Sequence, residues 1–398
     1  MLATVPGFTQ PSSVATVTVN ADTTPPHLVA ASALASQSGA TFDVGVTFDK
    51  PVDPASAETL ANYTLSAGTR TAVKYYAGSP GVVLTVSGLT VGNSYSVTVA
   101  NIADPYGNRM TSANLPFTVS SLHWGVVGGN ELNLSNGVVA VSPNAFDIYS
   151  DGIGEWGAYD ETTFVYEQIT GDFDKEVRVE YQDPSSQWAR AGLIARDVTN
   201  FGVNRAAQEG GAAGRYQKIH VNPVTTAMGT PGNNLWEGNR RLQTGGQTDS
   251  AFSGVNSNPL YPNAWCRLQR VGQTFNIFRS DDGVAWVNVG STVWPAPAMP
   301  DLLYVGMEYT PEDGNVDSSL RSMFVAKYRD YRTHAASRPT LAIARNGDGT
   351  FTLTYTGALV SSDTATGTYT PVSGASSPWI VAPKAVGAKS TQFYRAQQ

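Results

Sequence analysis

Aromatic and charged side chains gather along one alternating stretch of the sequence, residues 171–197. Alternation with a period of two indicates strands with one apolar and one polar face. Glu180, Trp188 and Arg190 fall on the polar face, and the stretch is predicted to form a hairpin of two strands joined by a polar turn. Aromatic rings beside planar polar groups suit a sugar, which presents apolar C–H faces and a ring of hydroxyl groups.

The same parity, applied to the later strands, extends this polar face, and two tryptophans in Gly-rich loops add further rings. The candidate ligand-binding residues are Trp156, Glu180, Trp188, Arg190, Tyr216, His220, Trp236, Arg267 and Glu308. Trp156 lies among glycines and acids, which fits either a rim that grips a ligand or a loop pinned to the core. For the whole face, the alternative is a solvated sheet on which opposite charges form cross-strand pairs.

Carboxylates are also the groups that glycoside hydrolysis uses in pairs, one attacking or activating water and one protonating the leaving group. Glu176 and Glu180 flank Arg178, so the Glu-x-Asp-x-x-Glu pattern of retaining glucanases is absent. If the chain is an enzyme, Glu180 and Glu308 are the predicted catalytic residues. The sequence contains no phosphate-binding Gly-rich loop and no nucleophile elbow.

A second cluster of acids offers oxygen ligands for a cation. Asp147, Asp151 and Asp160 belong to a Gly-rich acidic stretch, and carboxylates with backbone carbonyls are the ligands that calcium prefers. The stretch lacks the regular oxygen spacing of known calcium loops. A structural calcium ion is therefore one hypothesis for this stretch, and an ion-free polar loop is the other. The sequence indicates no other cofactor.

Composition places the chain among extracellular all-β proteins, because charged residues are 14% of its 398 residues and glycine is abundant. The net charge of -7, without any basic stripe, argues against a nucleic-acid partner. No stretch approaches the apolar length of a membrane span. Cys266 is the only cysteine and is predicted to be a small buried hydrophobe, so no disulfide can form within the chain. These features favour an exported bacterial protein, extracellular or on the cell surface.

Strand and turn signals divide the chain. Residues 1–21 lack the basic region and apolar core of a signal peptide and are predicted to be a linker or the tail of an upstream β domain. Residues 22–121 show short strands at sandwich spacing, and Leu89 to Tyr95 has the spacing of a tyrosine corner. This part resembles the bacterial Ig-like domains, through VTFDKPVDPASAETLANYTLS and VANIADPYGNRM. The resemblance implies a spacer or platform.

Residues 122–335 form a larger predicted β domain. Its series GDFDKEVRVEY, WARAGLIARD, WCRLQRVGQTFNIFRSDDGVAWVNVG and LYVGMEYT resembles the concanavalin A-like jelly rolls related to the regulation-of-enolase protein. The resemblance implies two packed sheets with a concave face that binds a ligand. The sequence departs from that pattern in residues 199–263, which read as a long polar insertion with a single strand near residues 215–222.

Residues 336–398 are predicted to be a small β module, similar to the C-terminal β modules of exported bacterial proteins through SSDTATGTYTPV and FYRA. The sequence thus predicts an all-β, multimodular protein whose jelly roll binds a polysaccharide or a cell-surface glycan on its concave face and long loops. Two alternatives remain open: a glycoside hydrolase or polysaccharide lyase that uses acids of the same groove, and a structural or adhesion protein made of passive spacers.

Overall fold

The computed structural model describes residues 22–36, 39–128, 136–224, 235–253, 258–312, 322–334, 341–381 and 392–397. Residues 1–21, for which a linker or an upstream β tail is predicted, lie outside the described residues. The chain divides into two compact units, Met1–Thr333 and His334–Gln398. Strands make up nearly all of the regular structure in both units, so the predicted all-β class is confirmed.

The N-terminal region of the first unit, residues 22–119, is a small sandwich of short strands. Its elements are β1 (Leu28–Ala35), β2 (Thr41–Phe48), α1 (Pro54–Ala57), η1 (Leu60–Asn62), β3 (Tyr63–Leu65), β4 (Thr69–Tyr75), β5 (Gly81–Ser87), β6 (Ser94–Ala100) and the first half of β7 (Ser112–Val127). Valines from several strands, such as Val44, Val82 and Val97, form its core. The predicted tyrosine corner is confirmed, because Thr90 N donates a hydrogen bond of 3.1 Å to the Tyr95 hydroxyl.

The second region, residues 120–333, adds the strands and short helices that position the site. They are β8 (Gly137–Ser142), β9 (Ala145–Ser150), β10 (Thr162–Thr170), β11 (Phe173–Gln182), β12 (Arg190–Arg196), α2 (Arg205–Ala207), η2 (Gln208–Ala212), β13 (Tyr216–Val221), β14 (Trp236–Arg241), β15 (Asp249–Ser253), β16 (Ala264–Val271), β17 (Thr274–Ser280), β18 (Val287–Val293), β19 (Leu302–Thr310) and β20 (Phe324–Thr333).

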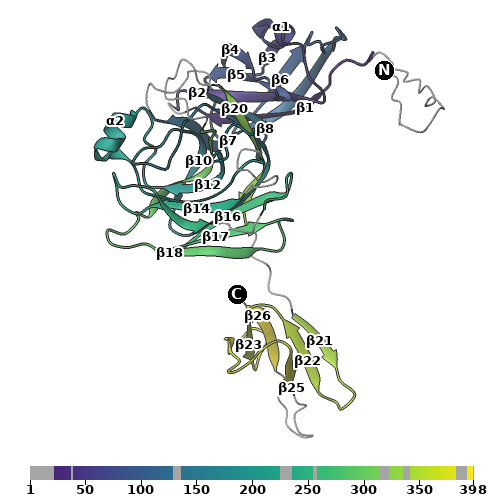
Figure 1. Ribbon diagram of the computed structural model, residues 1–398. Helices are drawn as coiled ribbons and strands as arrows, with labels where there is room; N and C mark the ends of the chain where they lie inside the picture. The colour runs from purple at the N-terminus through teal and green to yellow at the C-terminus, as the bar shows by residue number, and fades with distance from the viewer. Residues whose placement is uncertain are drawn as a thin grey trace, which may run out of the picture. The chain divides into compact units, whose positions relative to one another are not determined.

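Two curved sheets pack over one another in this region (Figure 1). The larger sheet runs β15-β14-β13-β12-β19-β10-β7 and continues through β1, β2, β5 and β4 into the N-terminal region. The smaller sheet runs β18-β17-β16-β11-β20-β9-β8. Alternate residues of both sheets meet in a shared core, in which Val177 and Val179 of the smaller sheet face Ala191 and Leu193 of the larger. These four residues form the apolar face that the alternation of residues 171–197 predicts, and that face is buried in the core.

The predicted hairpin of residues 171–197 is wrong. β11 pairs with β16 and β20, whereas β12 pairs with β13 and β19, so the two strands belong to opposite sheets. Both strands alternate because each has one face on the shared core, and alternation alone does not say whether consecutive strands pair. Their polar faces consequently point to opposite sides of the molecule.

Residues 199–263 also differ from the prediction. They contain three strands, β13, β14 and β15, where the sequence indicated one strand in a long loop. The segment WEGNRR conceals β14 because only Trp236 is an apolar core residue; the next inward position is Gly238, where a Cβ would lie 2.3 Å from Ile277 Cδ1. Cys266 is buried in the core, as predicted, and burial raises the pKa of its thiol.

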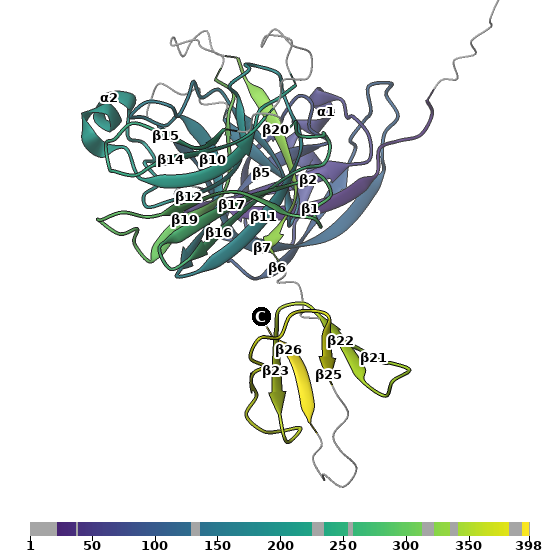
Figure 2. The same ribbon diagram turned by 60° about the horizontal axis from the view of Figure 1, so that its bottom comes forward.

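The N-terminal and second regions are joined by more than a linker. β7 pairs with β6 through its first half and with β10 through its second half. Trp124 Nε1 donates a hydrogen bond of 2.6 Å to Asp43 Oδ2 across the junction. A Cβ on Gly45 would lie 2.2 Å from the Ala140 carbonyl oxygen, so the close approach of β2 and β8 requires glycine. Figure 2 shows the strands of the two regions side by side.

The second unit has its own small core around Leu353, Tyr355 and Leu359. Its strands are β21 (Leu341–Arg345), β22 (Phe351–Tyr355), β23 (Ala358–Ser362), β24 (Thr370–Pro371), β25 (Trp379–Val381) and β26 (Phe393–Gln397). They form two sheets, β21-β22-β25 and β24-β23-β26. Among the residues that the structure describes, no helix is long and apolar enough to cross a membrane.

Candidate functional site

One face of the larger sheet, here called the site face, is turned away from the shared core and carries charged residues. On β12 and β13 the core takes Ala191, Leu193, Ile219 and Val221, so the residues between them point to the opposite side. The register places Glu308 beside Gly192, Gly192 beside His220, and His220 beside Glu237. The site face is therefore defined by Arg190, Lys218, His220, Glu237 and Glu308.

The loop between β9 and β10, residues 151–161, lies against the site face and is fixed to it by its backbone. The Glu155 carbonyl oxygen accepts hydrogen bonds from the Tyr216 hydroxyl, at 3.1 Å, and from Thr248 Oγ1, at 2.6 Å. The side chain of Tyr216 is fully buried beneath this contact. The loop is thus held in one position, and its next residue, Trp156, is presented with half of its surface exposed, 50%.

The other end of the same loop is held by charge. Asp160 accepts two parallel hydrogen bonds from Arg241, at 2.7 and 2.8 Å, and a third from Arg196, at 2.7 Å. All three side chains are fully buried, with 0% exposure. A buried carboxylate between two guanidinium groups is strongly held, because removing one partner leaves an uncompensated charge in a medium of low dielectric.

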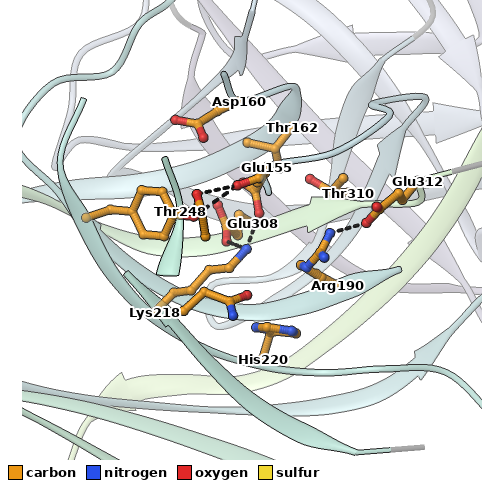
Figure 3. Close-up of polar contacts among 12 residues, drawn as sticks. Glu155, Asp160, Thr162, Arg190, Lys218, His220, Thr248, Glu308, Thr310 and Glu312 are labelled. Atoms are coloured by element: carbon orange, nitrogen blue, oxygen red, sulfur yellow. Dashed lines mark hydrogen bonds and ion pairs between the residues drawn. The ribbon is translucent and has the colours of Figure 1, made fainter. Parts of the chain in front are cut away.

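A buried lysine joins the loop to the sheet. Lys218 Nζ forms ion pairs with Glu155 and, at 3.0 Å, with Glu308 Oε1, and the three side chains are at most 1% exposed. Figure 3 shows the amine of Lys218 directed at both carboxyl groups. Lys218 and Glu308 come from strands on either side of β12. Gly192 lies between these strands beside Glu308, and a Cβ there would lie 2.1 Å from the Ile219 carbonyl oxygen.

Burial and mutual contact drive the pKa values of these groups apart. Burial opposes the charge of Lys218, but Glu155 and Glu308 outweigh it and raise the pKa of the amine. Burial and the neighbouring Glu155 raise the pKa of Glu308 well above its ordinary value. Burial also opposes ionisation of Glu155, but Lys218 and the contact with Glu308 leave its pKa lowered. Of the two carboxyl groups, Glu155 is thus the one that ionises more readily and Glu308 the one that holds a proton more readily.

His220 and Glu237 form a second pair on the same face. Nε2 of His220 lies 3.3 Å from Glu237 Oε2. Burial lowers the pKa of His220 to about 4, so the ring is neutral at neutral pH. Burial opposes ionisation of Glu237, but its hydrogen bond with His220 and the charge of Arg190 leave its pKa lowered. Glu237 therefore carries an ionised carboxylate opposite an uncharged ring.

These elements enclose a cavity of about 430 Å³ lined by Trp156, Trp188, Arg190, Glu237, Ser250 and Glu312. Trp188, in the turn before β12, is 42% exposed. Arg190 is buried and forms an ion pair with Glu312, which Figure 3 shows directed at the guanidinium group. Glu312 has a left-handed backbone, φ +51°, a conformation that costs a non-glycine residue free energy and that holds its carboxylate here.

The structure brings together only part of the predicted binding set. Trp156, Trp188 and Arg190 line the cavity. Tyr216, His220 and Glu308 lie on the site face but are fully buried in the network beside it. Tyr216, His220 and Glu308 therefore lie on the predicted face. Direct contact with a ligand remains a prediction for the other three residues, which line the cavity.

Three other predicted residues do not belong to the site. Glu180 and Arg267 lie on β11 and β16 of the smaller sheet, where Glu180 pairs with Arg329 at 3.0 Å and Arg267 pairs with Asp174 at 2.6 Å. The predicted catalytic pair of Glu180 and Glu308 is therefore divided between two sheets. Trp236 is fully buried in the shared core and presents no surface to a ligand. The first two errors come from assembling strands by parity alone, and the third from taking β14 for a loop.

The calcium hypothesis is not supported at the predicted acids. Asp160 is saturated by two arginines, Asp147 pairs with Arg329 at 2.9 Å, and Asp151 accepts a hydrogen bond from Asn136. Within the described ranges, no group of three or more His, Cys, Asp or Glu side chains could hold a metal ion. The acids near this loop are used to bind arginine and amide groups instead.

Sequence reasoning missed three charged residues of the site: Lys218, Glu237 and Glu312. Lys218 has the same parity as Tyr216 and His220, which puts it on the polar face, but nothing in the sequence shows that it joins Glu155 to Glu308. Glu237 follows the core residue Trp236, so a strand at this position would have put it on the site face. Glu312 continues the parity of Glu308 beyond the end of β19.

Residues 22–119 match the family described as a bacterial Ig-like domain. This segment is a bacterial Ig-like domain. Its strands share the larger sheet with the strands of the site face through β7. The match ends before the site, so it carries no information on what the cavity binds. No curated protein sequence is significantly similar to the chain.

Three solved structures are similar over parts of the chain. A protein of unknown function from Saccharomyces cerevisiae has 16% identity and a TM-score of 0.38, over 54% of this chain and 97% of that one. A xylan beta-1,4-xylosidase from Bacillus halodurans has 13% identity and a TM-score of 0.31, over 76% of this chain and 52% of that one. An alginate lyase mutant in complex with alginate trisaccharide has 12% identity and a TM-score of 0.29, over 53% of this chain and 88% of that one. At these scores, the substrates of the two enzymes remain properties of those enzymes alone.

Proposed function

We propose that the protein is an exported carbohydrate-binding protein whose ligand occupies the cavity on the site face. The observation that carries this proposal is the pairing of two exposed indoles, Trp156 and Trp188, with Arg190, Glu237 and Glu312 around about 430 Å³. Large apolar side chains are expensive to expose unless a partner covers them. The resemblance of residues 170–330 to concanavalin A-like jelly rolls supports the same interpretation.

The cavity offers the two kinds of contact that a sugar ring needs. An indole covers the apolar C–H face of the ring, and polar groups that line the cavity bind its hydroxyl groups. Glu237 accepts hydrogen bonds, Arg190 donates them, and Ser250 does both. Because Arg190 and Glu312 already hold each other and the loop carrying Trp156 is fixed by Glu155, little ordering accompanies binding.

A panel of soluble oligosaccharides and polysaccharides, titrated into the full chain by calorimetry, tests the proposal. We expect Trp156→Ala and Trp188→Ala each to weaken binding about tenfold, the equivalent of one lost ring contact. Both side chains are about half exposed, so the variants should fold. The matched control is Tyr106→Ala, which removes an exposed ring, 76% accessible, from the Ig-like domain. Binding that both tryptophan variants leave unchanged would contradict the proposed site.

A glycoside hydrolase or polysaccharide lyase is the second candidate, and one observation favours it. Glu155 and Glu308 are neighbouring carboxyl groups whose pKa values are shifted in opposite directions, which is the pattern of an acid–base pair. Against it stands their burial, at most 1% exposure, beneath the ion pairs with Lys218. If the protein were such an enzyme, the polysaccharides that it binds would yield new reducing ends or unsaturated products. We expect neither.

The third candidate, a passive spacer or adhesion protein, is favoured by the Ig-like domain alone. It predicts that no glycan binds and that neither tryptophan variant has a phenotype. The proposed extracellular or cell-surface location rests on the same domain and on the composition of the chain, and is tested by fractionating cells that express the full-length protein.

A further inference from the structure

The charged groups that line the cavity carry more negative than positive charge. Glu237 and Glu312 supply two carboxylates, and Arg190 supplies the one cation. Arg190 and Glu312 are held together as an ion pair, so they nearly cancel each other. Glu237 has a neutral partner, because the fully buried His220 ring is uncharged. The carboxylate of Glu237 is thus the uncompensated charge of the cavity.

The charged groups beneath the cavity do not make the net charge around it positive. Lys218 is the cation there, and it forms ion pairs with Glu155 and Glu308. One guanidinium group is in excess where Arg196 and Arg241 share Asp160. Those two arginines are paired in register with Tyr216, four residues from His220 along β13. Neither arginine lines the cavity, and both guanidinium groups are engaged by Asp160.

The two exposed indoles also favour a positively charged ligand. The face of an indole ring is electron-rich and attracts a cation such as an ammonium group. A carboxylate would meet that face and the carboxylate of Glu237 together. We infer that the cavity takes a glycan unit that carries an amine and excludes one that carries a carboxylate. The inference rests on the proposed function and names the class of sugar that the same site would bind.

Three tetrasaccharide probes separate the classes: a β-1,4-linked glucosamine tetramer, its fully N-acetylated form, and a tetramer of uronic acids. They are titrated into the full chain at about pH 6, where the sugar amine is largely protonated and His220 is neutral. We expect the amine form to bind about tenfold more tightly than the N-acetylated form, the equivalent of one charge-assisted hydrogen bond. We expect no binding of the uronic acid tetramer.

Glu237→Gln keeps the shape of the side chain and removes its charge, so the ratio between amine and N-acetylated forms should fall to about one. Glu180→Gln makes the same change in net charge on the far side of the smaller sheet and should leave the ratio intact. A ratio that survives in Glu237→Gln would reflect general attraction to an acidic protein and would overturn the inference.

The remaining outcomes distinguish the inference from the proposed function. If the uronic acid tetramer binds most tightly and both tryptophan variants weaken it, the cavity binds sugars but the inferred class is wrong. If none of these probes binds and the wider glycan panel is also negative, the proposed function and this inference fail together.

Discussion

Two arginine–aspartate pairs, each joined by two hydrogen bonds, lie on opposite sides of the sandwich and differ in their structural role. Arg241 donates two parallel hydrogen bonds to Asp160, at 2.7 and 2.8 Å. Arg267 does the same to Asp174, at 2.7 and 2.6 Å. The first pair is fully buried on the site face, whereas the second, on the smaller sheet, is 12% and 22% exposed. The number and length of the hydrogen bonds are therefore similar in the two pairs, and burial distinguishes them.

The difference has a structural consequence. Water and salt screen the exposed pair, so its removal affects little beyond the two side chains. The buried pair holds the loop of residues 151–161, which carries Glu155 to Lys218 and presents Trp156 at the cavity. Removal of one charge of the buried pair is thus expected to disturb the loop that lines the cavity. The polar face of the smaller sheet is instead a solvated surface of local ion pairs.

The largest expected effect comes from Asp160→Ala. The substitution leaves Arg196 and Arg241 buried without a counter-charge, which costs about 3–5 kcal/mol of unfolding free energy. Urea denaturation followed by tryptophan fluorescence measures the loss. Glycan binding should be lost with it, because the loop that carries Trp156 is released. A loss below about 1 kcal/mol would mean that burial does not distinguish the two pairs.

An intermediate effect is expected from pH, through His220. Its pKa is lowered from 6.5 to about 4, chiefly by burial. Between these values the unfolded chain binds a proton that the folded chain does not, so stability falls as the pH falls from 6.5 to about 4. The full effect is on the order of 3 kcal/mol.

The His220→Gln variant isolates this contribution, since Glu237 also has a lowered pKa and gives a slope of the same sign. Unfolding free energies of both proteins are compared across the same pH range. The parent chain should lose stability more steeply than the variant. Parallel curves would show that the ring is protonated in the folded state at an ordinary pH.

The smallest effect is expected from Asp174→Ala on the smaller sheet. Arg267 stays partly exposed, and water replaces the lost carboxylate, so the unfolding free energy should fall by no more than about 1 kcal/mol. Added salt should reduce the difference further. Glycan binding should not change. A loss as large as that of Asp160→Ala would show that the two faces are equally dependent on their ion pairs.

Much of the secondary structure of the second region follows from the sequence. The alternation of Val177, Val179, Ala191 and Leu193 correctly predicts one buried face on β11 and one on β12. The sequence of residues 263–290 also predicts three strands with tight turns at Val271-Gly272 and Asp281-Asp282-Gly283, in agreement with β16, β17 and β18. Periodicity succeeds here because each strand buries every second residue in the same core.

The arrangement of those strands could not be predicted in the same way. Alternation gives the face of each residue relative to its own strand, but strand pairing depends on which sheet the strand joins. Glu180 and Trp188 are eight residues apart, yet Glu180 lies on the smaller sheet and Trp188 lines the cavity of the larger one. The single polar face predicted from residues 171–197 therefore combined residues of two separate surfaces, one on each sheet.

The sequence by itself determined the all-β class, the buried cysteine and three residues around the cavity: Trp156, Trp188 and Arg190. Tertiary structure alone decided that Glu155, Lys218 and Glu308 meet, since they come from a loop and two strands separated by β12. The physical reason is burial. The sequence does not show whether a charged side chain will be exposed to water or buried by the fold. Only a buried charge costs much free energy when its partner is missing.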